Sequence, residues 1–308
     1  MPYHMRAAAI FGLGSSAKTL TPFQKDSAVT WTMGIPASST EADAILIFGG
    51  DGTIHRHLAQ LVKLQLPVLV VPCGSGNDFA RSLNLRNLQD SLAAWRKFST
   101  GGSNMRKIDL GVITALDSKA TESVATRNLK PETGNSSYFC CVGGVGLDGE
   151  IAHRANRLPR WLRAHGGYAL SLPSALLRYT PQPMKILAAD VKHSEIFIER
   201  SNQPTVVVAF ANTPVYGGGM KIAPHAQLDD GQLDVCVVGN VSKLRLLRLF
   251  PSVYFGRHLG VREVEYFQVA RLMIETEKPL DVYADGEYVC RTPIEVSAAP
   301  QALTVLVP

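Results

Sequence analysis

The sequence predicts two domains, an α/β domain followed by a mostly antiparallel β-sandwich. In the first third of the chain, short apolar runs alternate with helical patterns, and two of these runs end in glycine-rich loops. From about residue 108, the apolar runs become richer in β-branched and aromatic residues and are separated by Gly, Pro, Asn and Asp. We therefore expect the α/β domain to cover 1–109 and the sandwich to cover 110–297. The tail 298–308 is expected to pack back on the first domain.

The elements follow from these patterns in order. Ala44–Phe48 is a continuous apolar run, as expected of an interior parallel strand, and Val68–Val71 is a second one. Helical spacing follows the first strand at Ile54, Leu58, Leu61 and Val62, and the second at Leu88, Leu92 and Trp95.

In the second domain, four runs are expected to be strands: Tyr138–Val142, Val206–Phe210, Leu233–Val238 and Val264–Ala270. The polar segment Thr114–Ser137 is expected to be a surface excursion. Helical periodicity returns across Trp161–Leu177 and at Leu244, Leu247 and Phe250.

Composition narrows the class of protein. Hydrophobic residues make up 46% of the 308 and charged residues 19%, so the chain can bury large cores. The five cysteines are odd in number and form no C-x-x-C pair, which favours a reducing, cytoplasmic compartment over a disulfide framework or zinc knuckle. No apolar run approaches the ~18 residues of a membrane span, and Met1–Phe11 does not read as a secretory signal. The formal net charge of +5 fits either solubility or attraction to anionic lipid.

The segment Phe48–Thr53 reads Phe-Gly-Gly-Asp-Gly-Thr between a buried strand and a helix. Glycines let an anion approach main-chain amides, and the helix start adds N–H groups and the positive end of its dipole, so phosphate is the favoured guest. Asp51 would repel phosphate unless a cation or a hydrogen-bonding role offsets its charge. For this loop alone, an equal alternative is a simple turn in which Asp51 caps the helix.

A second loop, Pro72–Arg81, follows the next strand. Because ligands of open α/β sheets bind at the carboxyl ends of strands, the two loops are expected to face one crevice. Ser75 and Asn77 offer neutral donors, and Asp78 offers a carboxylate for magnesium or a water. Neither a Walker A loop nor a dinucleotide fingerprint is present.

Together, a G-G-D-G-T loop and a P-x-G-[ST]-x-N-D-F-A-R loop resemble the catalytic domain of diacylglycerol kinases and their bacterial lipid-kinase relatives, which include sphingosine and ceramide kinases. Further matches follow in the family's order, and the resemblance extends from about residue 44 to the C-terminus. These matches are Lys107–Gly111, Gly143–Asp148, Asn212–Thr213, Tyr216–Met220, Ala223–Pro224, Asp229–Asp234 and Ala284–Glu287.

The resemblance implies an N-terminal nucleotide-binding domain of the NAD kinase and diacylglycerol kinase type, followed by a lipid-acceptor sandwich. It implies an ATP-dependent, Mg²⁺-requiring transfer of phosphate to the hydroxyl of a membrane lipid such as diacylglycerol, a sphingoid base, ceramide or phosphatidylglycerol. We expect the enzyme to work at the inner face of the membrane against anionic lipid, without nucleic acid as a partner. A homodimer is left open.

The resemblance also assigns a nucleotide site. The first loop is expected to hold the phosphates, the second to complete the site, and Thr30 to contact nucleotide from the end of the family's second strand. For Thr30 a plain strand residue is an equal alternative. The full set is Thr30, Gly49, Gly50, Asp51, Gly52, Thr53, Ser75, Asn77 and Asp78.

Asp285 is the expected general base, because phosphoryl transfer needs a carboxylate to accept the proton of the lipid hydroxyl. Glu287 faces the same side of an extended strand. The alternative is that Asp285-Gly286 forms only a hairpin turn.

Two magnesium sites are implied. Asp78, Asp109 and Glu287 resemble the network that places catalytic magnesium, and a structural magnesium is implied at the loop Gln227–Leu233. There Asp230 would supply a carboxylate, and Gln227 and Gln232 main-chain carbonyls, an oxygen-only set that suits Mg²⁺. A solvated acidic turn is the alternative.

The segment Arg154–Arg178 interleaves basic with apolar and aromatic residues, a pattern that suits the lipid headgroup layer. A helix packed on the sandwich with a solvated basic face is an equal alternative. The basic residues are Arg154, Arg157, Arg160, Arg163 and Arg178.

The chain departs from the family in two places. Ile10–Ser16 stands where the family has an N-P-x-[SA]-G turn, and the first helix is shortened; Ile54-His55-Arg56 replaces the usual x-N-E after Gly-Asp-Gly-Thr. A second hypothesis is that the protein is an NAD kinase, although this hypothesis does not explain the motifs Asn77–Arg81 and Asp285–Glu287. A third is a non-catalytic sensor of lipid or nucleotide.

Overall fold

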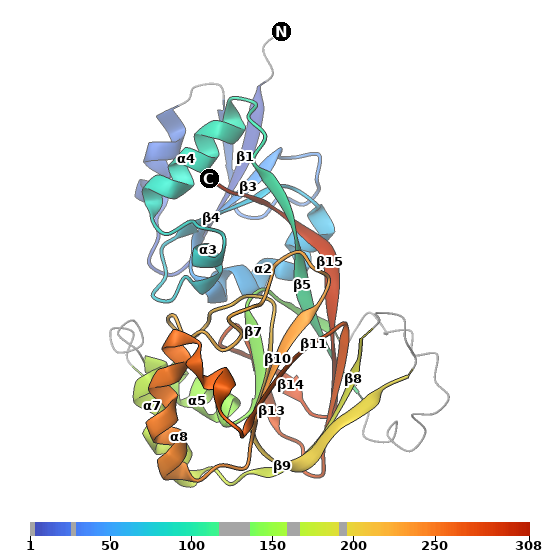
Figure 1. Ribbon diagram of the computed structural model, residues 1–308. Helices are drawn as coiled ribbons and strands as arrows, with labels where there is room; N and C mark the ends of the chain where they lie inside the picture. Colours follow the sequence, from blue (N-terminus) through green and yellow to red (C-terminus); the bar gives the residue numbers. More distant parts are fainter. Residues whose placement is uncertain (1–3, 26–28, 117–135, 159–166, 191–195) are drawn as a thin grey trace. The chain divides into compact units, whose positions relative to one another are not determined.

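The computed structural model describes residues 4–25, 29–116, 136–158, 167–190 and 196–308 (Figure 1). The chain divides into two compact units. The first consists of Met1–Asp109 with Pro300–Pro308, and the second of Leu110–Ala299.

The first unit is built on a parallel sheet with the strand order β2-β1-β3-β4-β15. Every residue of the third strand is buried, because both faces of such a sheet are covered. The strands are β1 (Met5–Phe11), β2 (Val29–Met33), β3 (Ala44–Gly49), β4 (Val68–Pro72) and the end of β15 (Ile294–Leu306).

Helices connect these strands. The predicted helix after the first glycine loop is α2, which buries Ile54, Leu58 and Leu61. The helix predicted from Leu88 onward is α4, which begins at the cap Asn87 and buries Trp95. The helices of this unit are α1 (Ala17–Leu20), η1 (Thr21–Lys25), α2 (Asp51–Leu64), α3 (Asp78–Ser82) and α4 (Leu88–Ser99).

The C-terminal residues lie in the first unit. Val305 of β15 pairs with Val68 of β4. Buried Asn104 donates from its side chain to the carbonyl of Val307 at 2.8 Å, and the N–H of Val307 donates back to the Asn104 carbonyl at 3.0 Å. The last strand is therefore fastened to the chain just before β5 (Met105–Ala115).

The second unit is mostly antiparallel. Strand β9 pairs with β7, β8 and β10; β10 also pairs with β11, β8 with β12, and β13 with both β7 and β14. The strands are β6 (Ser136–Phe139), β7 (Val142–Gly146), β8 (Gln182–Ala189), β9 (Ile198–Ala211), β10 (Leu233–Gly239), β11 (Val264–Val269), β12 (Arg271–Thr276), β13 (Asp281–Ala284) and β14 (Glu287–Arg291), with parts of β5 and β15.

The sandwich core is aliphatic with one aromatic pair. Phe139 of β6 and Phe210 of β9 meet edge to face with ring centroids 5.5 Å apart. Val208, Leu272 and Ile294 are among the fully buried residues around them. With the parallel sheet of the first unit, this architecture confirms the predicted fold class.

A smaller apolar cluster joins the helices of the second unit to β9. It includes Leu147 and Ile151 of α5, Leu172 and Leu176 of α7, and Val206 of β9. These helices are α5 (Leu147–Arg157), α7 (Gly167–Arg178) and α8 (Lys243–Leu249), followed by η3 (Phe250–Phe255) and η4 (Arg257–Gly260); Figure 1 shows α5, α7 and α8 gathered together. Within the described ranges, every helix falls short of the length and apolarity that a bilayer crossing needs.

Two predicted elements differ from the structure, and a third lies mostly outside the described residues. The run Tyr138–Val142 is not one strand, because β6 ends at Phe139 and β7 begins at Val142. Of the three residues that marked the last predicted helix, Phe250 packs on the cluster together with Leu246, whereas Leu244 and Leu247 are exposed. Most of the expected surface excursion, residues 117–135, lies outside the described residues.

Candidate active site

The first glycine loop joins β3 to α2. Gly49 ends the strand, Gly50 is the extended cap residue of the helix, and Asp51 is its first residue. Thr53 donates its N–H to the Gly50 carbonyl at 2.9 Å, and its side chain is buried. The 14-residue helix therefore starts directly at the loop, with the positive end of its dipole there.

The second glycine loop touches the first, backbone against backbone. A Cβ on Gly74 would lie 2.5 Å from the Cα of Gly50, and a Cβ on Gly50 would lie 2.9 Å from the Cα of Gly74. Cys73 also donates its N–H to the Gly49 carbonyl at 3.0 Å. Only glycine fits at these two positions, so the predicted meeting of the two loops at the carboxyl ends of β3 and β4 is observed within this unit.

Asp51 fastens one loop to the other. Its two carboxylate oxygens accept the N–H groups of Asp78 and Phe79, each at 3.0 Å. The carboxylate thus satisfies two N–H groups at the start of α3, and this hydrogen-bonding role offsets its charge.

The remaining polar residues of the second loop have different tasks. Asn77, in the left-handed region with φ 56°, accepts from the Gly74 N–H at 2.9 Å and donates to the Gly74 carbonyl at 2.7 Å. Its amide therefore shapes the loop, in contrast to the outward donor that the sequence suggested. Ser75 is exposed at the tip, and buried Asp78 forms an ion pair with Arg81 at 2.9 Å.

Sequence reasoning missed a third turn beside these loops. The Gly12 N–H donates to the Phe48 carbonyl at 2.8 Å, and the Ser15 hydroxyl lies 2.6 Å from the same carbonyl. A Cβ on Gly12 would lie 2.1 Å from the Thr53 hydroxyl oxygen. The signal was present in the sequence, because this Gly-Leu-Gly-Ser turn occupies the position of the family's missing N-P-x-[SA]-G turn.

Thr30 does not belong to this site. It pairs with Arg6 near the start of β1, whereas the glycine loop follows Phe48, which pairs with Phe11 at the end of β1. Arg6 and Phe11 are five residues apart along β1, so Thr30 lies about 17 Å along the sheet from the level of Phe48, at 3.3 Å per residue. Thr30 is an exposed strand residue whose hydroxyl lies 2.5 Å from His4 Nε2, so the expected nucleotide contact is corrected.

Asp109 is buried at the end of the first unit, and its carboxylate accepts the N–H of Gln301 at 2.7 Å. Gln301 has a positive φ of 52°. The side chain therefore holds the left-handed backbone of Gln301 within β15.

Asp285 and Gly286 form the turn between β13 and β14. Both have positive φ, 52° and 84°, as a two-residue hairpin turn of type I′ requires. The alternative reading of Asp285-Gly286 as a hairpin turn is therefore correct for the backbone. Glu287, the first residue of β14, is exposed.

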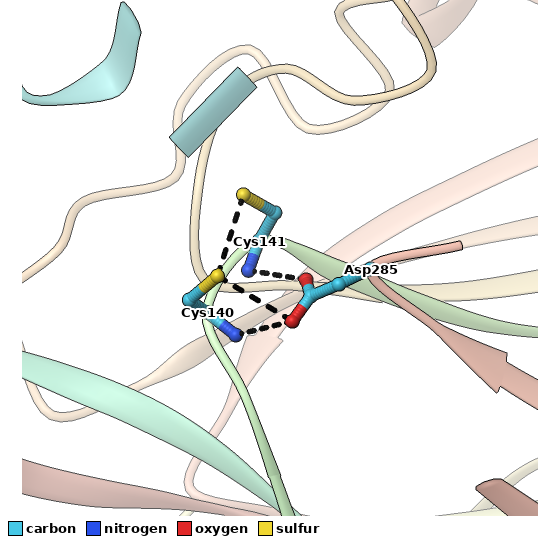
Figure 2. Close-up of side chains that lie close together, drawn as sticks. All are labelled: Cys140, Cys141 and Asp285. Atoms are coloured by element: carbon cyan, nitrogen blue, oxygen red, sulfur yellow. Dashed lines mark hydrogen bonds between the residues drawn. The ribbon is translucent and has the colours of Figure 1, made fainter. Parts of the chain in front are cut away.

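The Asp285 side chain has a second task beyond the turn. Its carboxylate accepts the main-chain N–H groups of Cys140 at 2.9 Å and Cys141 at 2.8 Å (Figure 2). The Asp285 N–H in turn donates to the Val142 carbonyl at 3.0 Å. The break between β6 and β7 at the two cysteines thus holds a half-buried carboxylate in one orientation.

A buried carboxyl group lies at the start of α5. Asp148 accepts a hydrogen bond from the Tyr216 hydroxyl at 2.6 Å. Burial raises the pKa of Asp148 to about 6, and the Tyr216 hydrogen bond opposes this rise. Burial beside Asp148 also raises the pKa of Tyr216. This pair joins the Gly143–Asp148 motif to the Tyr216–Met220 motif, and sequence reasoning assigned it no role.

The loop Gln227–Leu233 brings Asp230 near Asp234. Asp230 accepts from the Gln232 N–H at 3.0 Å, and the Gln268 amide lies 3.2 Å from Asp230 and 3.3 Å from Asp234. Burial raises the pKa of Asp234, while hydrogen bonds from Tyr266 and Gln268 lower it. Gln227 is exposed. The Asp230 carboxylate is therefore turned back toward the backbone of its own loop.

Comparisons with known proteins agree with this architecture. Residues 19–113 match the family model described as diacylglycerol kinase catalytic domain. Residues 141–307 match the one described as YegS C-terminal NAD kinase beta sandwich-like domain.

Two curated relatives illustrate the similarity. The chain is 31% identical over 266 residues to the diacylglycerol kinase of Mycobacterium tuberculosis (strain ATCC 25618 / H37Rv), which covers 86% of this chain and 77% of that protein. It is 26% identical over 258 residues to the diacylglycerol kinase of Bacillus subtilis (strain 168), covering 82% and 73%.

Two crystal structures of proteins from Bacillus anthracis str. Sterne share the fold. Their TM-scores are 0.70 and 0.64 at 19% and 18% identity, covering 100% of this chain and 99% and 98% of theirs; the second protein is named a diacylglycerol kinase. The chain therefore belongs to the diacylglycerol kinase-like family of lipid kinases, phosphotransferases with an alcohol group as acceptor.

Proposed function

We propose that this enzyme transfers the γ-phosphate of ATP to the hydroxyl of a membrane lipid, with diacylglycerol as the first candidate. The observation that carries the proposal is the pair of interlocked glycine loops, Gly49–Thr53 and Gly74–Asp78, at the start of α2. The names of the M. tuberculosis and B. subtilis relatives support diacylglycerol as the acceptor.

The loops suit a nucleotide phosphate for a physical reason. Gly50 and Gly52 carry no side chain to keep an anion away from the main chain, and α2 directs the positive end of its dipole to the same place. The Asp51 charge is engaged by two N–H groups of α3. Asn77 then holds the second loop in the shape that permits the contact between Gly50 and Gly74.

Asp285 is the proposed general base. As the lipid oxygen attacks the γ-phosphorus, the carboxylate accepts the hydroxyl proton, and ADP leaves with the electrons of the broken phosphoanhydride bond. The N–H groups of Cys140 and Cys141 keep the carboxylate in one orientation, and the Cys140 thiol lies 3.4 Å from one of its oxygens. We propose that Glu287, the first residue of β14, contributes a second carboxylate to the catalytic site.

The residues implied for magnesium fit it in chemistry. Asp230 and the carbonyls of Gln227 and Gln232 form an oxygen-only set, as Mg²⁺ prefers, and we propose that they hold a structural ion. Asp78, Asp109 and Glu287 are proposed to place a catalytic ion, which would neutralise charge on the transferred phosphate. Loss of Mg²⁺-dependent protection against thermal unfolding in an Asp230→Asn variant would test the structural site.

A surface on the second unit suits a bilayer, and we call it the α7–α8 surface. Leu177, Leu244 and Leu247 are 74%, 61% and 39% exposed, and basic residues lie among them in sequence: Arg178, Lys243 and Arg248. Lys243 donates to the Leu177 carbonyl at 2.7 Å, so the end of α7 lies beside the start of α8. Apolar side chains interleaved with cations favour an anionic lipid surface.

The wider segment proposed from the sequence is only partly described. Arg160 and Arg163, with Trp161 and Leu162, lie outside the described residues. Arg154 is paired with Glu150 at 2.6 Å, and Leu172 is buried in the helix cluster. The α7–α8 surface is therefore the part of the proposal that this structure supports.

The deciding experiment offers purified protein Mg-ATP with mixed lipid vesicles in one reaction and NAD in another. Phosphorylated diacylglycerol with unmodified NAD is the expected result. Phosphorylated NAD with unmodified lipid would replace the proposal with the NAD kinase reading. Bound ATP or lipid without any transfer would favour a sensor.

A further inference from the structure

Two buried thiols lie near the carboxylate of Asp285. The sulfurs of Cys140 and Cys141 lie 3.9 Å apart, and Cys140 Sγ lies 3.4 Å from Asp285 Oδ2 (Figure 2). One ligand atom from each residue can be chosen so that all lie within 4.8 Å of one another. Neither thiol has a role in the proposed transfer of phosphate.

These spacings match those of a tetrahedral metal site. A zinc ion with Zn–S bonds of about 2.3 Å and a Zn–O bond of about 2.0 Å sets two sulfurs about 3.8 Å apart, and a sulfur and an oxygen about 3.5 Å apart. The observed 3.9 Å and 3.4 Å agree with two of the three ligand–ligand edges to about 0.1 Å, and the third, from the Cys141 sulfur to the carboxylate, is no longer than 4.8 Å.

We propose that Cys140, Cys141 and Asp285 form an inhibitory site for a thiophilic divalent cation, with Zn²⁺ as the best fit. Two thiolates and one carboxylate supply three ligands, and a water completes the fourth position. Binding displaces one proton from each thiol, which leaves a neutral pair of thiolates and zinc beside the Asp285 carboxylate. Mg²⁺ does not compete for this site, because soft thiolate ligands select against it.

Inhibition follows from the shared ligand and rests on the proposed function. An Asp285 oxygen that binds a cation is no longer a base for the lipid hydroxyl. The simpler interpretation is that both cysteines only fill the core, since free cysteine is often buried. Core packing alone does not require the Cys140 sulfur to approach the Asp285 carboxylate while the Cys141 sulfur lies beside it.

The first test measures binding without any assay of activity. The reduced full-length protein is titrated with Cd²⁺, which reports thiolate ligation by an ultraviolet charge-transfer band, and with Zn²⁺ in competition. We expect one equivalent to bind in the wild type and in the control Cys290→Ala, a half-buried thiol elsewhere in the second unit. Cys140→Ala, Cys141→Ala and Asp285→Asn should each weaken binding by about tenfold or more, since even outer-shell changes cost 10- to 100-fold.

The second test measures lipid phosphorylation with increasing Zn²⁺ at fixed Mg-ATP. Wild type and Cys290→Ala should be inhibited over the Zn²⁺ range in which binding occurs and recover with a zinc-selective chelator. The rate of Cys141→Ala, whatever its value without zinc, should stay constant over the same Zn²⁺ range. Unchanged Cd²⁺ binding in both cysteine variants, each shown to be folded by circular dichroism, would overturn the inference. A wild-type band in a protein without kinase activity would overturn only the proposed function.

Discussion

Asp51, the first residue of one helix, caps the helix that begins 27 residues later at Asp78. Its carboxylate accepts the N–H groups of Asp78 and Phe79, so the motif Gly-Gly-Asp-Gly-Thr and the motif Asn-Asp-Phe-Ala-Arg are parts of one structure. These two hydrogen bonds engage the charge of an acidic residue in the loop that we propose holds phosphate.

The first prediction concerns this cap. Asp51→Ala leaves two N–H groups of α3 without their acceptor, which should lower the free energy of unfolding by about 1–2 kcal/mol and weaken ATP binding. Denaturant unfolding and nucleotide titration measure the two effects. Asp190→Ala, at a largely exposed carboxylate, is the control and should change stability by less than about 0.5 kcal/mol. Full stability of Asp51→Ala would show that the cap contributes nothing.

The second prediction concerns the contact between the loops. Gly74→Ala places a methyl group 2.5 Å from the Gly50 Cα, so one backbone must shift. The cost should be about 1–3 kcal/mol of stability, as for other overpacked sites, with a raised KM for ATP. Gly260→Ala is the matched control, because a Cβ there meets nothing within 4 Å. Equal behaviour of the two variants in unfolding and in kinetics would contradict the interlocked loops.

The third prediction concerns the proposed base. Asp285→Asn keeps the size of the side chain and tolerates positive φ, but an amide neither accepts the hydroxyl proton nor satisfies both cysteine N–H groups. Turnover should fall by about 10²- to 10⁴-fold, while the affinity for ATP, measured by titration, stays the same. Asp281→Asn, in the same hairpin and paired with Arg291, should retain turnover. An Asp285→Asn enzyme as fast as wild type would remove this carboxylate from the mechanism.

The fourth prediction concerns the α7–α8 surface. Leu246 and Phe250 hold α8 on the protein, so Leu244→Glu should leave the fold intact and weaken binding to vesicles with anionic lipid. We expect a loss of about tenfold, which corresponds to 1.4 kcal/mol, with no change in the rate on a water-soluble short-chain diacylglycerol. Ile198→Glu is the control, since Ile198 is equally exposed on β9. Sedimentation with vesicles that contain phosphatidylglycerol measures the difference; unaltered sedimentation of Leu244→Glu would exclude this surface.

Local sequence patterns predicted the parts of the fold that depend on local chemistry. The buried run at Ala44–Phe48 and the glycines after it were sufficient to place β3 and the start of α2. They were not sufficient to place Thr30. A local pattern can identify a strand, but it does not give the register with the neighbouring strand, and that register sets Thr30 beside Arg6. Nor did they show the partner of Asp51 or the contact of Asp285 with Cys140, since both bonds join segments far apart in the sequence.

The last prediction concerns pH and the buried pair of Asp148 and Tyr216. The pKa of Asp148 is raised in the folded protein from 3.8 to about 6, so the folded state favours the neutral acid. Its contribution to stability is therefore complete below about pH 4 and is lost as pH rises through 6. The difference of about 2 pKa units corresponds to about 3 kcal/mol.

Asp148→Asn stays neutral and can still accept from the Tyr216 hydroxyl. Free energies of unfolding for wild type and Asp148→Asn should therefore be similar at pH 4 and separate in favour of the variant by pH 7. Tyr216→Phe removes a hydrogen bond that lowers the Asp148 pKa, so the loss of stability in that variant should continue to a higher pH than in the wild type. Curves for wild type and Asp148→Asn that run parallel from pH 4 to 7 would contradict the raised pKa of Asp148.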